Sequence, residues 1–501
     1  MTHRPVQRLV AFALVVALSL VVGMGVVGRM ETAAVAVVGM CALALCVAYP
    51  QFGVAALVVS GFSIEWMVAS GFLPRTAQIL QDLLAIALLA VIVVRSRRSG
   101  TGAFFMVAGR WVLLFAACGL AGAVVAGLHP VAVIMGLRSW VVFVPLALIP
   151  HGLRFDEEQL RRLLVLVLGL SVFQVPVAIL QFLFLRTGSS GDAVGGTLGV
   201  YSSGVLTVLM IATTAFFIGR MIHRHGSAAK AGLALALCMV PPALNETKVF
   251  FVAAPTILSV LFLPRVQKSA ARAFVILVMV VLAFVLVFQS YQSLYGQTFE
   301  GQDVVERLVL QETGDELAEG GVMKRLPSII FAANEISDRP ATLLFGHGAG
   351  SLTRSDLVGM QGALLELYGS SLRSTVWLTR LLLEYGFLGL LAFMGLLVSV
   401  YRAARRVERE STEAVWRAFG VGMQGAVLTM AVMSVYTGTF TTDGLNCAFW
   451  AYAGITGRLV ALRASALSDG SGGALESGQE ESGLSAPRVG GDEVIAARAG
   501  A

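Results

Sequence analysis

Three positively charged residues have neighbours that make them candidates for binding phosphate: Lys248, Arg138 and Arg325. Lys248 follows a double proline at 241–242, and Glu246 lies two residues before it. A double proline stops or bends a helix, so backbone groups freed at membrane depth must face protein or water. Lys248 could then bind a diphosphate with Glu246 as its orienting partner. The alternative is an ion pair that closes a solvated turn.

Arg138 and Gln181 lie within apolar runs. Arg138 comes two residues before Trp140, so it either binds phosphate or extends to lipid headgroups beside an interfacial aromatic ring. Gln181 lies seven residues after Gln174, a spacing that puts both amides on one face of a helix. Such amides contact either sugar hydroxyls or a neighbouring helix.

A glycine-rich run ends the longest polar stretch of the chain. Gly346 and Gly348 allow backbone N–H groups to approach an anion or a sugar closely, and His347 between them could act as a base near neutral pH. The run lacks the strand before it and the helix after it that a nucleotide-binding loop requires. A purely structural role for His347 in a tight turn is the alternative.

Arg325 precedes this run in a stretch that is compatible with a helix, as does Arg307. Two guanidinium groups beside a membrane surface would suit bidentate recognition of phosphate, although arginines in exposed loops are usually just solvated. The position of Arg325 ahead of the glycine-rich run makes it the better candidate.

The composition predicts an all-α, polytopic helical membrane protein. The chain has 501 residues, of which 57% are hydrophobic and 13% charged, and its mean hydropathy is +0.82; a soluble core cannot bury that much apolar surface. About 12 to 14 runs are long enough to cross a bilayer. They fall at residues 9–27, 33–49, 54–70, 77–94, 111–128, 132–150, 163–184, 200–219, 231–245, 249–263, 273–289, 379–400, 418–436 and 445–462.

Basic residues cluster in alternate loops, which predicts that those loops are cytoplasmic. Both termini are then cytoplasmic, and one large loop is extracytoplasmic. The predicted organisation is N-terminal transmembrane helices at 1–288, the large periplasmic loop at 289–375, C-terminal transmembrane helices at 376–463 and a disordered cytoplasmic tail at 464–501. The net charge of +6 is spread over these clusters, so we expect no nucleic-acid partner.

The five cysteines lie in or at the edges of apolar runs without the spacing of metal ligands. Outer carboxylates such as Asp356 are scattered along the chain. We therefore expect no metal site and no cofactor.

The stretch from Arg325 through Gly346-His347-Gly348-Ala349-Gly350 and on to Glu384-Tyr385-Gly386-Phe387-Leu388-Gly389 resembles the O-antigen ligase and O-antigen polymerase superfamily of bacterial inner-membrane glycosyltransferases. The specific motif lies within 325–391, and the layout of helices and large loop is similar over about 1–463. The resemblance implies a protein of the cytoplasmic (inner) membrane that builds a cell-surface polysaccharide.

The resemblance also implies a substrate and roles for residues. The donor is an oligosaccharide linked to undecaprenyl diphosphate, and the partners are the lipid bilayer and a glycan acceptor. Arg325 is the residue expected to hold the diphosphate, and His347 or Glu384 would take the proton of the acceptor hydroxyl. Thr375 stands where the ligases have a histidine, which favours a polymerase or another branch.

Other functions share parts of this layout. A lipid-linked oligosaccharide flippase, or another transporter that exports polysaccharide, would need charges distributed through a central cavity. A peptidoglycan polymerase would need a catalytic acidic residue in the outer loop. A secondary transporter would show internal repeats, and a non-enzymatic scaffold would need no site at all.

Overall fold

The computed structural model describes most of the chain between residues 50 and 480. The described residues are 50–96, 108–184, 193–199, 202–245, 247, 249–266, 323–355, 359–372 and 375–480, with isolated positions in 39–49 and 274–289. The predicted runs at 9–27, 33–49 and 273–289 therefore lie wholly or largely outside the described residues, as do Glu246 and Lys248.

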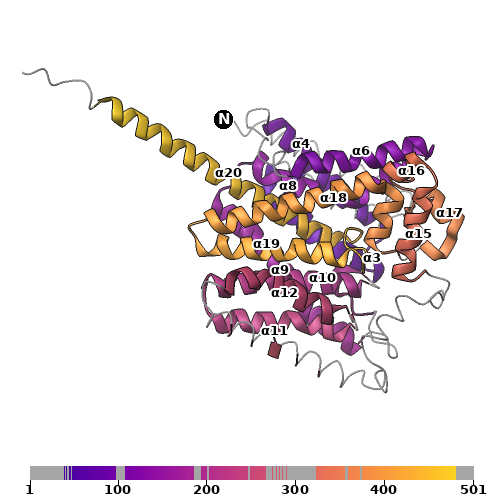
Figure 1. Ribbon diagram of the computed structural model, residues 1–501, viewed down its shortest axis with the longest axis horizontal. Coiled ribbons are helices and arrows are strands. Elements are labelled where there is room, and N and C mark those ends of the chain that lie inside the picture. Colours follow the sequence, from indigo (N-terminus) through magenta and orange to yellow (C-terminus); the bar gives the residue numbers. More distant parts are fainter. Residues whose placement is uncertain are drawn as a thin grey trace, which may run out of the picture. The chain divides into compact units, whose positions relative to one another are not determined.

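The described chain is almost entirely helical, as predicted (Figure 1). Its α-helices are α3 (Pro50–Ala69), α4 (Gln78–Ser96), α6 (Arg110–Val125), α7 (Pro130–Val141), α8 (Val144–Gly152), α9 (Glu157–Phe184), α10 (Ser203–Ile222), α11 (Ala228–Leu244), α12 (Phe250–Val266), α15 (Arg325–Ser337), α16 (Pro340–Phe345), α17 (Ala363–Tyr368), α18 (Trp377–Glu410), α19 (Ala414–Met433) and α20 (Asp443–Glu480). Short 3-10 turns are η1 (Arg75–Ala77), η4 (Gly196–Leu198) and η6 (Gly369–Leu372). The strands β1 (Arg354–Ser355) and β2 (Met360–Gln361) pair antiparallel, with Arg354 opposite Gln361.

Among the described residues, six helices are long and apolar enough to cross a membrane. A seventh span is formed if α7 and α8, which are bent by 58° at their junction, are counted together. Pro145 opens α8 directly after the bend, and its missing N–H and fixed φ explain why one continuous helix does not form. The polytopic helical class is thus confirmed, and the full count of 12 to 14 spans stays a prediction.

The helices α10 and α19 form the centre of the bundle. In the most apolar window of α10, 89% of the residues are buried, so this helix is enclosed on nearly all sides. Small residues allow the backbones to approach: a Cβ added to Gly219 would meet Ala418 O at 2.3 Å, and one added to Gly425 would meet Ala215 Cβ at 2.3 Å. Close approach of small residues is a common way to pack helices in a membrane.

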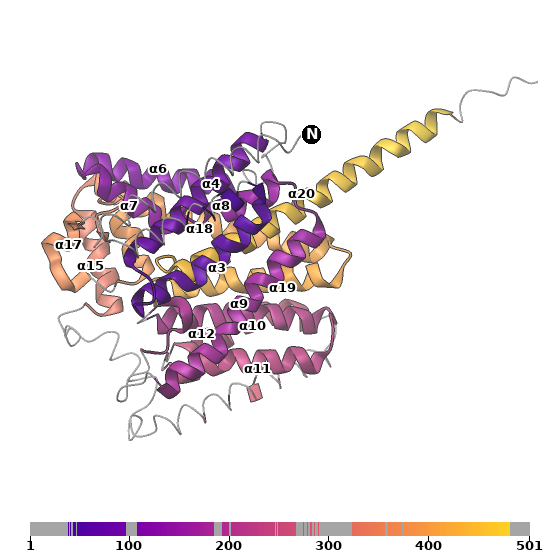
Figure 2. The same cartoon turned by 180° about the vertical axis from the view of Figure 1, so that it is seen from behind.

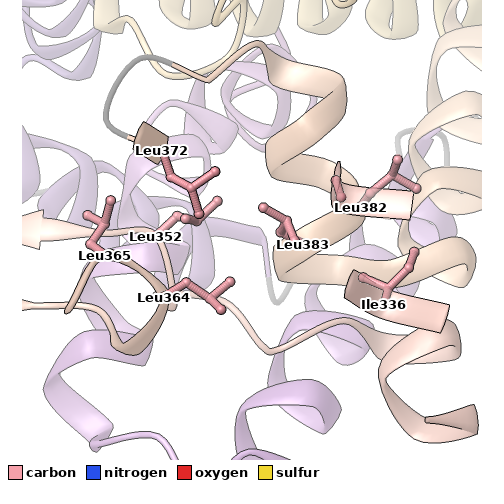
Figure 3. Packing of buried hydrophobic residues seen from close by; sticks show 8 residues of the cluster. Ile336, Leu352, Leu364, Leu365, Leu372, Leu382 and Leu383 are labelled. Atoms are coloured by element: carbon pink, nitrogen blue, oxygen red, sulfur yellow. The ribbon is translucent and has the colours of Figure 1, made fainter. Parts of the chain in front are cut away.

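The described residues 323–355 and 359–372 form a compact unit that we call the cap. It contains α15, α16, α17 and η6, and Figures 1 and 2 show these helices gathered at one end of α6 and α18. The cap shares an apolar cluster with the start of α18 (Figure 3), which includes Ile336, Leu352, Leu364, Leu365, Leu372, Leu382 and Leu383. The described residues 323–355 and 359–372 of the predicted large loop therefore pack on the bundle.

Three of the segments predicted to be cytoplasmic, around residues 155–161, 413–416 and 458, meet at the end of the bundle opposite the cap. Arg161 pairs with Glu413 at 2.8 Å, and Trp416 Nε1 donates to Glu157 at 3.0 Å. Arg458 Nε donates to the carbonyl oxygen of Phe155 at 2.9 Å. These contacts agree with the predicted alternation of loops, while the orientation relative to a membrane stays a prediction.

The chain divides into Met1–Val460 and Ala461–Ala501. The tail was predicted to be disordered from residue 464, yet α20 continues to Glu480. Residues 481–501 lie outside the described part of the chain.

Candidate functional site

The glycine-rich turn at 346–351 lies against three helices of the bundle. Gly346, Gly348 and Gly350 all have positive φ, which glycine adopts without a steric penalty. A Cβ on Gly348 would meet the backbone N of Ala123 on α6 at 2.2 Å, and one on Gly350 would meet the carbonyl oxygen of Ala132 on α7 at 2.1 Å. The glycines therefore permit close packing of the turn against α6 and α7.

The backbone N–H groups of the turn bind protein acceptors. The N–H of His347 donates to Leu383 O at 2.7 Å, and that of Ala349 donates to Gly119 O at 3.0 Å. We expected Gly346 and Gly348 to bring N–H groups to an anion or sugar. The structure uses the neighbouring amides of His347 and Ala349 to attach the cap to the bundle, and the N–H of Gly346 donates to the carbonyl oxygen of Thr342 within the cap at 2.7 Å. A ligand-binding role of Gly348 stays a prediction.

Glu384 on α18 binds the glycine-rich turn through its carboxylate. Its Oε1 accepts hydrogen bonds from the N–H groups of Gly350 at 3.2 Å and Leu352 at 3.0 Å. Its Oε2 accepts from Arg380 Nε at 2.8 Å, and Glu384 is only 1% exposed. Glu384 was predicted to take a proton from an acceptor; we assign it instead to holding the turn, because both oxygens are already bound.

The helix α18 breaks at Gly386 in the motif that carries the family resemblance. Gly386 has φ 64° inside the helix, and a Cβ there would lie 2.5 Å from the backbone N of Gly346. Next to the break, Tyr385 stacks on Phe115 with ring centroids 4.1 Å apart and accepts a hydrogen bond from Trp140 Nε1 at 2.9 Å. The break thus fits α18 to both the turn and α7.

Arg138 lies on α7 and is paired with a carboxylate. Its Nε is 2.8 Å from both carboxylate oxygens of Asp82 on α4. The carboxylate of Asp443 interacts electrostatically with both Arg138 and Asp82. Arg138 therefore belongs to a network of charged residues within the protein. Its role in binding phosphate stays a prediction.

Like Asp82, two further carboxylates of this region were missed in the sequence. Glu65 on α3 is half-buried and interacts electrostatically with the carboxylate of Asp443, the first residue of α20. Both acidic residues lie at or near apolar runs, which was a usable signal because ionisable residues at membrane depth are costly unless paired.

Gln181 and Gln174 bind the loop that follows their helix. Gln181 Nε2 donates to Gly196 O, and Gly196 N donates back to Gln181 Oε1, both at 2.7 Å. Gln174 makes the same kind of contact with Thr197. We expected these amides to contact either sugar hydroxyls or another part of the protein, and the structure shows the second use. Both the nitrogen and the oxygen of the Gln181 side-chain amide form hydrogen bonds with the backbone of Gly196.

Arg325 begins α15 at the junction of the cap and the bundle. Its guanidinium carbon lies 3.7 Å from the centroid of the Tyr436 ring, in the loop between α19 and α20. Ser328 fixes this end of the cap, because its hydroxyl lies 2.9 Å from the Thr379 hydroxyl on α18. Arg325 and Tyr436 are both half-buried, so solvent reaches the pair.

His347 lines a different part of the cap, a cavity of about 350 Å³ with both polar and apolar walls. Its Nε2 lies 3.8 Å from Glu335 Oε1, too far for a hydrogen bond, and Tyr368 donates to the other oxygen of Glu335 at 2.8 Å. Burial lowers the pKa of His347 below its usual value; Arg339 lowers it further, whereas Glu335 and Asp338 act in the opposite direction. His347 is thus neutral near pH 7.

The structure does not bring His347 and Arg325 together. Arg325 and Glu335 are ten residues apart on one α-helix, about 15 Å along its axis, and His347 lies beside Glu335. We therefore correct the expectation that these groups serve one reaction centre. Glu335 and Arg339 were missed, although their position just before Pro340 and the glycine-rich run was a signal.

In the part of the chain that the structure describes, no group of three or more His, Cys, Asp or Glu residues is placed to hold a metal ion.

In comparisons with known proteins, no family model matches the chain and no curated protein matches its sequence. Membership of the O-antigen ligase and polymerase superfamily therefore stays a prediction.

Proposed function

We propose that the protein is a membrane glycosyltransferase that moves or polymerises a glycan from a polyprenyl diphosphate carrier at the cap end of the bundle. The observation that carries this proposal is the half-buried pair of Arg325 and Tyr436, where the cap, α18 and the loop between α19 and α20 meet. A cation at such a junction is suited to the charged headgroup of a lipid-linked donor.

The chemistry of the guanidinium fits this role. Stacking on Tyr436 uses the face of the Arg325 side chain, whereas a guanidinium binds phosphate oxygens through the N–H groups at its edge. The contact also orients the group, so less conformational freedom is lost when phosphate binds. Arg325 would thereby stabilise the charge that develops on the departing diphosphate.

The surroundings of Arg325 provide half-buried polar groups for a glycan. Thr375 and Thr437 are both half-buried, and the N–H of Trp377 donates to the carbonyl oxygen of Thr437 at 3.1 Å. This hydrogen bond attaches the start of α18 to the loop that holds Tyr436. The hydroxyls can contact sugar while the backbone keeps the two segments in register.

In the proposed reaction, a hydroxyl oxygen of the acceptor forms a bond to the anomeric carbon of the donor. The bond from that carbon to the diphosphate oxygen breaks, with inversion, and polyprenyl diphosphate leaves with the bonding electron pair. The hydroxyl proton passes to solvent or to a diphosphate oxygen. Because the leaving group is already a stabilised anion, positioning and charge neutralisation are the main tasks of the protein.

The principal alternative is a flippase or another exporter of lipid-linked glycan. The central helices α10 and α19 each carry one charged residue, Arg220 and Arg417. Both residues fall toward the end that is opposite the cap. A diphosphate that crossed the membrane through the bundle would need cations along its path, and these two helices supply none at mid-depth.

The proposal is tested in cells that lack the protein and receive variants of it. Arg325→Ala should abolish long-chain polysaccharide on gels and leave glycan on its carrier, and Arg325→Lys should restore part of it. Arg162→Ala is the matched control, because Arg162 is exposed and lies at the opposite end. Normal polysaccharide with Arg325→Ala at normal protein abundance would refute the proposed role.

A further inference from the structure

The cavity beside His347 lies apart from the proposed transfer centre and has its own set of polar groups. It is a half-open pocket lined by the end of α6, by α15 and α16, by the glycine-rich turn and by α17. Glu335, Asp338, Arg339, His347 and Ser351 provide polar lining. The volume of about 350 Å³ is in the range of small-molecule sites.

Two buried polar atoms of this lining have unused hydrogen-bonding capacity. The Ser351 side chain is 0% exposed, and its hydroxyl has no hydrogen-bond partner among the residues that the structure describes. His347 Nε2 is likewise buried without a hydrogen bond to any described residue. Buried polar groups in proteins are nearly always satisfied, so these atoms point to a ligand that enters the cavity.

The charges of the cavity select the class of ligand. Two carboxylates, Glu335 and Asp338, face one guanidinium, Arg339, while burial keeps His347 neutral near pH 7. An excess of negative charge disfavours phosphate and carboxylate ligands. Carboxylates accept hydrogen bonds from hydroxyl groups, and Ser351 and His347 can each donate or accept one.

The remaining wall of the cavity is apolar. Leu364 and Leu367 of α17 lie on one side, and Val125 and Leu128 lie at and just after the end of α6. Leu364 also belongs to the apolar cluster of the cap (Figure 3), so this wall is held by packing. A sugar ring has hydroxyl groups at its edge and C–H groups on its faces, which matches polar and apolar walls together.

We propose that this cavity binds a neutral sugar residue of the glycan, as a subsite separate from the diphosphate site at Arg325. The assignment to a glycan rests on the proposed function, whereas the recognition of a neutral sugar rests on the cavity itself. Glu335 and Ser351 contact the sugar hydroxyls, and Tyr368 holds the Glu335 carboxylate in place. The subsite then positions the chain while transfer occurs about 15 Å away along α15.

The test is saturation-transfer NMR with the purified full-length protein and a panel of neutral monosaccharides: glucose, galactose, mannose, rhamnose and N-acetylglucosamine. At least one sugar should receive saturation, and inorganic phosphate should not displace it. Ser351→Ala and Glu335→Gln, which keep the shape of the cavity, should each weaken binding on the order of tenfold.

Arg325→Ala should bind the sugar as the wild type does, which separates this proposal from the proposed function. If Arg325→Ala leaves polysaccharide unchanged while sugar binding is lost in Ser351→Ala, only the proposed transferase role fails. Absence of transfer to every sugar of the panel, binding that both cavity variants retain, or displacement by phosphate would overturn the subsite.

Discussion

Arg380 donates from Nε to the carboxylate of Glu384 at 2.8 Å, one turn apart on α18, with side chains that are 14% and 1% exposed. The same carboxylate accepts hydrogen bonds from the backbone N–H groups of Gly350 and Leu352, at the end of the glycine-rich turn. Through Glu384, this buried ion pair on α18 is thus one of the contacts that join the cap to the membrane helices. Arg380 also donates to the hydroxyl of Thr353 in the cap at 3.1 Å.

Glu384→Gln should destabilise the protein by about 3 kcal/mol, because it leaves the largely buried Arg380 without its charge partner. Thermal unfolding of the purified protein, followed by tryptophan fluorescence, measures the change. Glu366→Gln on the exposed side of α17 is the matched control and should have almost no effect. Equal unfolding temperatures for the two variants would show that the ion pair does not hold the cap.

Gly348→Ala should lower the free energy of unfolding by about 3 kcal/mol. Position 348 has positive φ, and the new Cβ would overlap the backbone of α6. Gly127→Ala separates the two effects. Gly127 also has positive φ, but a Cβ there meets nothing within 4 Å, so the cost should be about 1 kcal/mol. Similar losses of stability in the two variants would contradict the close packing of the turn.

The lowered pKa of His347 makes a contribution to stability that depends on pH. Below the pKa of the unfolded chain, the unfolded state binds a proton that the folded state still excludes, so acid favours unfolding. The wild type should lose stability relative to His347→Asn as the pH falls below about 6.5, by at most about 1.4 kcal/mol per pH unit. Chemical unfolding at pH 7, 6 and 5 provides the data. A difference that is constant over this range would contradict the burial of a neutral imidazole.

Much of the fold follows from the sequence, because the length of an apolar run reflects the thickness of a bilayer. Each predicted run within the described residues corresponds to helical structure, and the pairing of Arg161 with Glu413 agrees with the alternation of basic loops. The bend between α7 and α8 was not expected, although Pro145 marks it. The continuation of α20 past residue 464 was also not expected.

The site was harder to predict, because a polar residue in a sequence carries no sign of its partner. The sequence made Gln181 and Glu384 plausible ligands of a substrate, yet each side chain forms hydrogen bonds with backbone groups of the protein itself. Glu335 was missed for the opposite reason, since only folding brings it to His347. The separation of Arg325 from His347 became evident only once α15 was seen as one helix.

The central claim, that Arg325 stabilises a departing polyprenyl diphosphate, is tested most directly by measuring that product. The purified protein in lipid vesicles is given a polyprenyl-diphosphate-linked oligosaccharide with an acceptor glycan, and released polyprenyl diphosphate is quantified over time. The wild type and Arg162→Ala should release it at equal rates, and Arg325→Ala should be slower on the order of 100-fold. Release by Arg325→Ala at the wild-type rate, or an intact donor after prolonged incubation with the wild type, would contradict the account.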